Sequence, residues 1–146
     1  MTAKTDYLEN KLIDHVFRGQ TYTPPATLYV GLFTSAPTDA GGGVEVTGGD
    51  YARVGVAASL ANWAGTQAAG STTASSGTGG TTSNNVAITF PAPTAPWGNV
   101  VAFGLFDALT GGNPLVGSAL TTPKTINNGD AAPSFAAGAL TFREDD

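Results

Sequence analysis

One histidine and a few scattered carboxylates are the residues of this chain whose types suit acid–base chemistry. His15 stands directly after Asp14, and a carboxylate beside an imidazole is a pair that activates hydroxyl nucleophiles. Neighbours at i and i+1 of a helix do not face each other, and both residues lie in a segment with helical periodicity. We therefore interpret His15 as an exposed surface residue that leaves the Ser and Thr hydroxyls without an activating base.

The carboxylates that lie away from the two ends are isolated along the chain: Asp39, Glu45, Asp50, Asp107 and Asp130. A calcium loop of the EF-hand type needs acidic ligands at near-alternate positions, which residues 39–50 do not supply. A glycosidase needs two carboxylates that face each other across a cleft, and the sequence marks no such pair. We expect no catalytic, cofactor-binding or metal-binding residue.

Glycine runs and tryptophans are the remaining features that suit ligand binding. Neither Gly41–Gly43 nor Gly79–Gly80 is followed by the lysine of a phosphate-binding loop, so both are predicted to be turns. The rings of Trp63 and Trp97 are the candidates for stacking on a sugar, which leaves a carbohydrate-binding module as one alternative. Core packing is the simpler interpretation of both rings.

The composition is typical of a protein that acts through its surface. The chain has 146 residues, a net charge of −5 and no cysteine, and charged residues make up only 12%, which is about half the usual share. Its six basic residues are too scattered to bind nucleic acid. No apolar run of membrane-spanning length occurs, and residues 1–10 lack the apolar core of a secretion signal. The stretch 54–106 has no charged side chain, so packing against a partner would desolvate no charge there; compositional drift in a Gly- and Thr-rich sequence is the alternative explanation.

One segment has helical periodicity and would carry the His15 region. Apolar residues at three- and four-residue spacing predict a helix over 7–18, within residues 5–19. Asp6 and Glu9 have the spacing of a capping box, and Gly19 follows the segment as a C-terminal cap. We expect this helix to pack on an apolar surface through four residues: Leu8, Leu12, Ile13 and Val16.

From residue 28 onward the period changes to two, which is typical of strands. The predicted strands are 28–33, 51–57, 86–90, 100–106, 115–120 and 135–142, with short local pairing at 44–47. In a single domain over 1–146 they predict an all-β fold, an antiparallel β-sandwich of jelly-roll type with one short N-terminal helix. The inward positions give the predicted core: Leu28, Val30, Leu32, Val54, Val56, Ile88, Phe90, Val101, Phe103, Leu105, Leu140 and Phe142.

Residues 64–85 consist almost entirely of Gly, Ser, Thr, Ala, Asn and Gln. This composition predicts a loop or a flexible arm. A loop of about twenty residues is unusually long for a compact domain unless it has a function. We expect the arm to order on a neighbouring subunit or to protrude from the assembly.

The segment from Leu28 to Arg53 joins three distinctive pieces. The sequence LYVGLFT at 28–34 precedes a turn with Pro37 and Gly41–Gly43, which leads to Glu45-Val46 and then, after Gly48-Gly49, to Tyr51-Ala52-Arg53. Over the first 57 residues this pattern resembles small virion proteins of tailed bacteriophages. Tyr51 and Arg53 share one face of their strand, so we expect Arg53 to lie along the Tyr51 ring or to reach a carboxylate.

The resemblance implies a structural virion protein, made in the host cytoplasm, and not an enzyme. The size and β-rich pattern are similar to those of capsid cement (decoration) proteins, which implies binding to the major capsid protein on the capsid surface. The alternative is a tail or tail-fibre component, as relatives are often described. We expect copies of the chain to form dimers or trimers through their edge strands, with no cofactor, nucleic acid or membrane as a partner.

Overall fold

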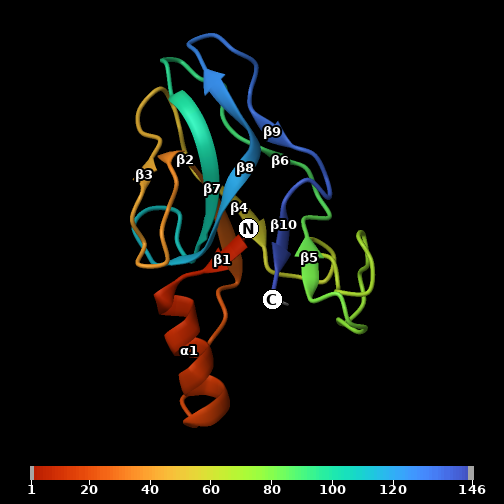
Figure 1. Cartoon of the computed structure of the whole chain (residues 1–146). Coiled ribbons are helices and arrows are strands. Elements are labelled where there is room, and N and C mark those ends of the chain that lie inside the picture. The colour runs from red at the N-terminus through yellow and green to blue at the C-terminus, as the bar shows by residue number, and fades with distance from the viewer. Residues whose placement is uncertain (1, 145–146) are drawn as a thin grey trace.

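Two mostly apolar nine-residue segments form the centre of the main sheet. The computed structural model describes residues 2–144, and in it β2 (Thr27–Ser35) pairs with β7 (Gly98–Phe106) (Figure 1). β8 (Pro114–Ile126) pairs with the other edge of β7, and β1 (Thr2–Lys4) pairs with β8. β3 (Val44–Glu45) and β4 (Val54–Ala57) pair with successive parts of β2. All of these pairings are antiparallel, as predicted.

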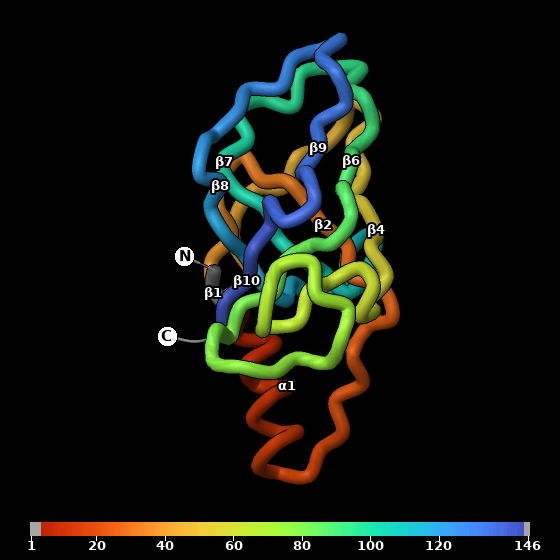
Figure 2. Tube along the Cα trace, turned by 90° about the vertical axis from the view of Figure 1, so that its right-hand side faces the viewer, coloured from red at the N-terminus to blue at the C-terminus, as the bar shows by residue number. Residues whose placement is uncertain are grey.

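Two short ladders form the second layer. β6 (Ile88–Thr89) pairs with β9 (Ser134–Phe135), and β5 (Thr81–Ser83) pairs with β10 (Thr141–Arg143). Figure 1 shows this layer beside the main sheet, and Figure 2 shows it facing the viewer. The main apolar cluster draws residues from both layers. The all-β antiparallel sandwich with one short helix is therefore confirmed.

Most of the predicted core is buried between the layers. Leu28 and Val54 are half-buried beside that core and not inside it. Val101 was placed wrongly, because it packs with Phe33 and Phe106 on the other face of the sheet, while Val100 points into the core. The pairing of β7 with β8 is irregular at this point, and a bulge shifts which residues face inward.

The helix α1 (Asp6–Phe17) projects beyond the β layers and does not cover them (Figures 1 and 2). None of its residues is buried, and Ile13, Val16 and Phe17 are 50%, 66% and 80% exposed. The prediction that α1 packs on the core was therefore wrong for Ile13 and Val16, whereas Leu8 and Leu12 are half-buried. The physical reason is that the short ladders already cover the apolar face of the main sheet.

Hydrogen bonds fix both ends of α1. The N-cap is Thr5, whose side chain accepts from the Leu8 N–H, so the predicted capping box of Asp6 and Glu9 was wrong. The Thr5 hydroxyl also donates to the Pro114 carbonyl at 2.6 Å, which ties the helix to the start of β8. Gly19 has the left-handed conformation (φ 69°) of a residue after a helix C-cap.

Residues 64–85 form a loop that rejoins the fold through β5. The Gln67 side chain bonds to Ser71, Thr73, Ala74 and Ser76 within the loop. Thr81–Ser83, at its end, forms β5 and was not predicted as a strand. Asn84 is fully buried, and its amide group bonds to Val86, Ala136 and Leu140. Whether the remaining loop contacts a neighbour stays a prediction.

Two matched substitutions distinguish the core from the exposed helix. Ile88 is fully buried, so Ile88→Ala should lower the free energy of unfolding by about 2–5 kcal/mol. Ile13→Ala should change it by less than about 0.5 kcal/mol, because a half-exposed side chain leaves no cavity and Ala favours helix. Urea unfolding followed by circular dichroism measures both, and equal losses would contradict this assignment of the core.

Candidate functional site

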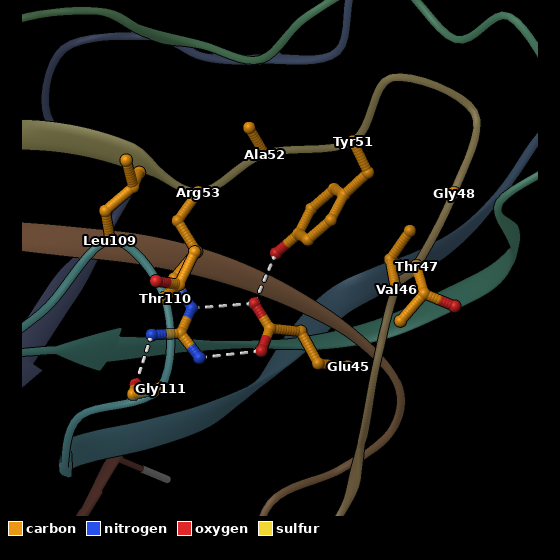
Figure 3. Close-up of a pocket in the computed structure, with 10 residues that line it drawn as sticks. All are labelled: Glu45, Val46, Thr47, Gly48, Tyr51, Ala52, Arg53, Leu109, Thr110 and Gly111. Atoms are coloured by element: carbon orange, nitrogen blue, oxygen red, sulfur yellow. Dashed lines mark hydrogen bonds and ion pairs between the residues drawn. The ribbon is translucent and has the colours of Figure 1, made fainter.

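The Arg53 guanidinium, directly before β4, makes four hydrogen bonds within the fold. Its Nε and Nη2 each donate to Glu45 at 2.8 Å, to Oε1 and Oε2 respectively (Figure 3). Its Nη1 donates to the carbonyls of Ala108 and Gly111, both at 2.8 Å. The Arg53 side chain is only 8% exposed. The sequence-based expectation that Arg53 reaches a carboxylate is confirmed, and this contact ties β4 to β3 and to the β7–β8 turn.

Tyr51 completes this arrangement from two residues away. Its hydroxyl donates to Glu45 Oε1 at 2.9 Å and accepts from the Leu32 N–H at 2.8 Å. Burial of the ring, with the Glu45 carboxylate adding to the effect, raises the pKa of Tyr51 well above its usual value. The Tyr51 ring meets Trp97 edge-on, at 5.3 Å between centroids. We call Glu45, Tyr51 and Arg53 the arginine lock.

An aromatic ring lies beneath the lock. The Arg53 guanidinium carbon is 3.4 Å from the centroid of the Phe106 ring, which is the geometry of a cation–π contact. Arg53 therefore does not lie along the Tyr51 ring, the other arrangement that the sequence allowed. Phe106 stacks in turn on Phe33, with the centroids 6.0 Å apart.

A row of glycines lets these side chains approach the sheet. Gly31, Gly104 and Gly117 stand opposite one another on β2, β7 and β8. A Cβ on Gly31 would lie 3.0 Å from Glu45 Oε1, and one on Gly117 would lie 2.7 Å from Pro37 Cγ. Close packing thus explains the glycine of LYVGLFT.

A pocket of about 400 Å³ opens beside the lock (Figure 3). Residues 46–48 and 109–111 contribute to its walls. The Tyr51 hydroxyl and four N–H groups of Arg53 already have partners inside the protein. The polar groups at this pocket hold three segments together, and the arrangement is that of a structural centre.

The other acid–base candidates lie in local contacts. Asp14 pairs with Arg18 at 3.3 Å, whereas His15 Nδ1 accepts from the Tyr22 N–H at 3.1 Å, so the structure does not make Asp14 a partner of the imidazole. Asp107 accepts from the Asn113 backbone and side chain and closes the β7–β8 turn. Within residues 2–144, no group of three His, Cys, Asp or Glu is placed to hold a metal ion. The one helix in that range is too short to cross a bilayer.

The remaining carboxylates and glycines lie in turns. Asp130 Oδ2 accepts from the Asn127 N–H, and the Asp39 carbonyl accepts from the Asp6 N–H. Asp50 has a positive φ of 60° in the loop before Tyr51. Positive φ angles also occur at Gly41, Gly43 and Gly80. The first glycine run follows a turn closed by the bond from the Gly41 N–H to the Thr38 carbonyl, whereas Gly79–Gly80 leads directly into β5.

The two tryptophans pack into the fold. Trp97 is 4% exposed and donates from Nε1 to the Gly49 carbonyl at 2.9 Å. Trp63 is half-buried against the main cluster and meets Phe142 edge-on. Core packing is confirmed for Trp97, whereas Trp63 is only partly buried against the core.

The exposed apolar surface of α1 was not recognised in the sequence. Ile13, Val16 and Phe17 lie at i, i+3 and i+4, so they share one side of the helix, and we call them the α1 patch. The signal was present, because Leu8, Leu12 and the α1 patch together span about half the helix circumference. A helix that packs on a core needs an apolar stripe of only about 100°. The apolar surface of α1 is therefore wider than packing on the core requires.

Comparison of the sequence with known protein families gives a match over nearly the whole chain. The family model described as Podophage GP4 fiber I protein gp80 matches residues 3–143. The chain belongs to this family. A comparison with curated proteins gave no match. The match extends beyond the N-terminal 57 residues that suggested a tailed-phage virion protein, and membership in a phage fibre family supports a structural virion component.

The ion pair of Glu45 with Arg53 should contribute far more to the free energy of unfolding than an exposed ion pair does. Glu45→Gln leaves the buried Arg53 guanidinium without its counter-ion, which should lower the free energy of unfolding by about 3 kcal/mol. Glu144→Gln makes the same chemical change in the more exposed pair with Lys4 and should cost less than about 1 kcal/mol. Urea midpoints of the two variants test this, and similar midpoints would contradict the role given to the lock.

Alkaline pH should weaken the contribution of Tyr51. Its pKa is raised by folding, so the stability it adds is complete below pH 10 and is lost as the pH rises above that value. Wild type should lose up to about 1.4 kcal/mol per pH unit through this group. Tyr51→Phe should lower the free energy of unfolding by about 1–3 kcal/mol at neutral pH, because the Leu32 N–H loses its partner. The difference in this free energy between the variant and wild type should become smaller above pH 10. A difference that grows above pH 10 would refute the raised pKa of Tyr51.

Proposed function

We propose that this protein is a non-enzymatic subunit of a virion fibre that attaches through the projecting helix α1. The fibre role draws on the family description, and the attachment mode rests on the exposure of the α1 patch. A 12-residue helix is of marginal stability alone in water, and a bare apolar side adds nothing until a partner covers it. The helix therefore gains most of its packing energy on assembly.

The rest of the molecule suits a rigid spacer. Several of its acid–base groups accept hydrogen bonds within the protein, as Glu45 does in the arginine lock and Asp107 and Asp130 do in turns, which supports a structural role over catalysis. Both tryptophans pack against the core, which weakens the carbohydrate-binding alternative. The protein then acts by presenting surfaces at a fixed distance and orientation.

Head or tail location is the finer question within a virion role. The capsid cement prediction rested on size and strand pattern, whereas the family description supports the tail-fibre alternative better. Copy number in purified virions separates the two, since a cement protein occupies the whole head lattice and a fibre only its attachment points. A copy number that matches the major capsid protein would overturn the fibre role.

The second half of β8 is a poor candidate for the edge-to-edge self-association expected from the sequence. The second half of β8 extends past its pairing with β1 and carries Pro123 and Lys124 there. Proline and lysine on an edge strand, together with the bulge in this ladder, disfavour the addition of another strand. This favours attachment by side chains of the helix.

Removal of the apolar α1 patch should prevent incorporation into virions. Val16→Gln with Phe17→Gln keeps residues that favour helix and should reduce the protein in purified particles at least tenfold, with unfolding unchanged. Leu60→Gln is the control, because Leu60 is a 55% exposed apolar residue outside α1. The Leu60→Gln protein should be incorporated normally. Quantitative gels of gradient-purified virions measure both variants. Full occupancy by the helix variant would contradict attachment through α1.

A further inference from the structure

An apolar groove opens between the end of β8 and β9, at the far end of the sandwich from α1. Leu32, Val100 and Ile126 line its base, and Leu120, Phe135 and Lys124 lie around it. The cavity measures about 150 Å³. A cavity of about this volume with an apolar lining accommodates a benzene molecule, which is the size of a phenylalanine ring.

The α1 patch offers a ring of that size. Phe17 is the most exposed large apolar residue of the described chain, at the tip of the projecting helix. Ile13 and Val16 flank it on the same side, so a ring inserted into a groove brings two aliphatic neighbours onto the rim. The groove therefore has the volume for the Phe17 ring and apolar residues at its base.

Charge complementarity points the same way. Lys124 lines the groove, and among residues 2–144 it has no ion-pair partner. Glu9 stands four residues before Ile13, on the same side of α1, and within that range it too lacks an ion-pair partner. It lies about 12 Å along the helix from Phe17, so one helix presents an apolar tip with an acidic group behind it.

The two surfaces lie at opposite ends of one strand. Thr5, which caps α1, bonds to Pro114 at the start of β8, whereas Lys124 and Ile126 belong to its end. The helix therefore cannot reach the groove of its own chain. A contact between different surfaces of identical subunits repeats without closing on itself unless the rotation between subunits closes a ring.

We propose that the α1 patch of one copy inserts into the β8–β9 groove of the next, with Phe17 in the cavity and Glu9 paired with Lys124. The inference rests on the proposed fibre function and specifies its partner as a second copy of this chain. The contact is head-to-tail, so it builds either a ring, such as a trimer, or an open row of subunits, and it is not the symmetric contact of a dimer. Each contact is small and therefore weak, and neighbouring contacts in a virion would add to it.

Charge reversal tests the ion pair. Wild type should associate with rising concentration in sedimentation equilibrium, and Phe17→Gln should weaken association at least tenfold. Glu9→Lys and Lys124→Glu should each weaken it about three- to tenfold, and the double variant should regain most of the loss. Equal unfolding midpoints exclude a folding defect as the cause. If the loss of association free energy in the double variant equals the sum of the losses in the two single variants, the pairing of Glu9 with Lys124 is refuted.

Cross-linking tests the geometry, because the chain has no native cysteine. Ile13→Cys keeps the Phe17 anchor, and Thr122→Cys lies at the groove. The two variants are mixed and treated with a short bismaleimide, and the yield of cross-linked dimer is measured. The yield should be far higher for Ile13→Cys with Thr122→Cys than for Ile13→Cys alone. It should also be far higher than for Ile13→Cys mixed with Ala58→Cys, which lies on the opposite edge of the sheet. Preferential Ile13-to-Ile13 linkage would overturn the inference in favour of a symmetric dimer.

The two proposals fail differently. If wild type remains monomeric at all accessible concentrations while the Val16→Gln, Phe17→Gln variant is still lost from virions, α1 binds another virion protein. The self-docking inference is then wrong and the fibre function stands. If the variant is incorporated normally, the attachment role of α1 fails whatever the state of the isolated chain.

Discussion

The buried Arg53 guanidinium is the constraint to which much of this fold is fitted. A desolvated cation is stable only where its charge and its donors are satisfied, and the fold supplies Glu45, two backbone carbonyls and the face of Phe106. Those partners come from β3, β7 and the β7–β8 turn, which are far apart in sequence. The lock can form only when these segments are in register, so it favours one arrangement of the sheet over slipped ones.

The glycine row follows from the same requirement. Phe33 and Phe106 occupy the outer face of the main sheet, where side chains on Gly31 and Gly104 would collide with them. Small residues at these positions let rings, a carboxylate and Pro37 lie directly on the backbone. The motif that suggested a phage virion protein is therefore a description of this packing. It identifies the family through its fold, and it carries no information about the binding surface.

Period-two alternation predicted β2, β7 and β8 because strand faces are set locally, by which neighbours are apolar. It failed at Val101, where a bulge in the β7–β8 ladder moves Val100 inward, since register depends on the partner strand. It also left open what Arg53 contacts, because Glu45 and the Ala108 carbonyl meet it only in three dimensions. The apolar positions of α1 were readable, but their burial was not, because that depends on whether the β layers leave any apolar surface uncovered.

The contrast between the two ends of α1 links stability to function. Its start is fixed by the buried Thr5 to the first residues of β8, while its tip exposes Phe17 to solvent. Transfer of such a side chain out of water is worth about 1.5–3 kcal/mol, which the isolated subunit forgoes. The polar groups around Arg53 are satisfied within the subunit, whereas the α1 patch is exposed. The interactions that stabilise the subunit are therefore separate from the surface that we propose joins it to others. In the proposed assembly, repetition would make the whole strong although each single contact is weak.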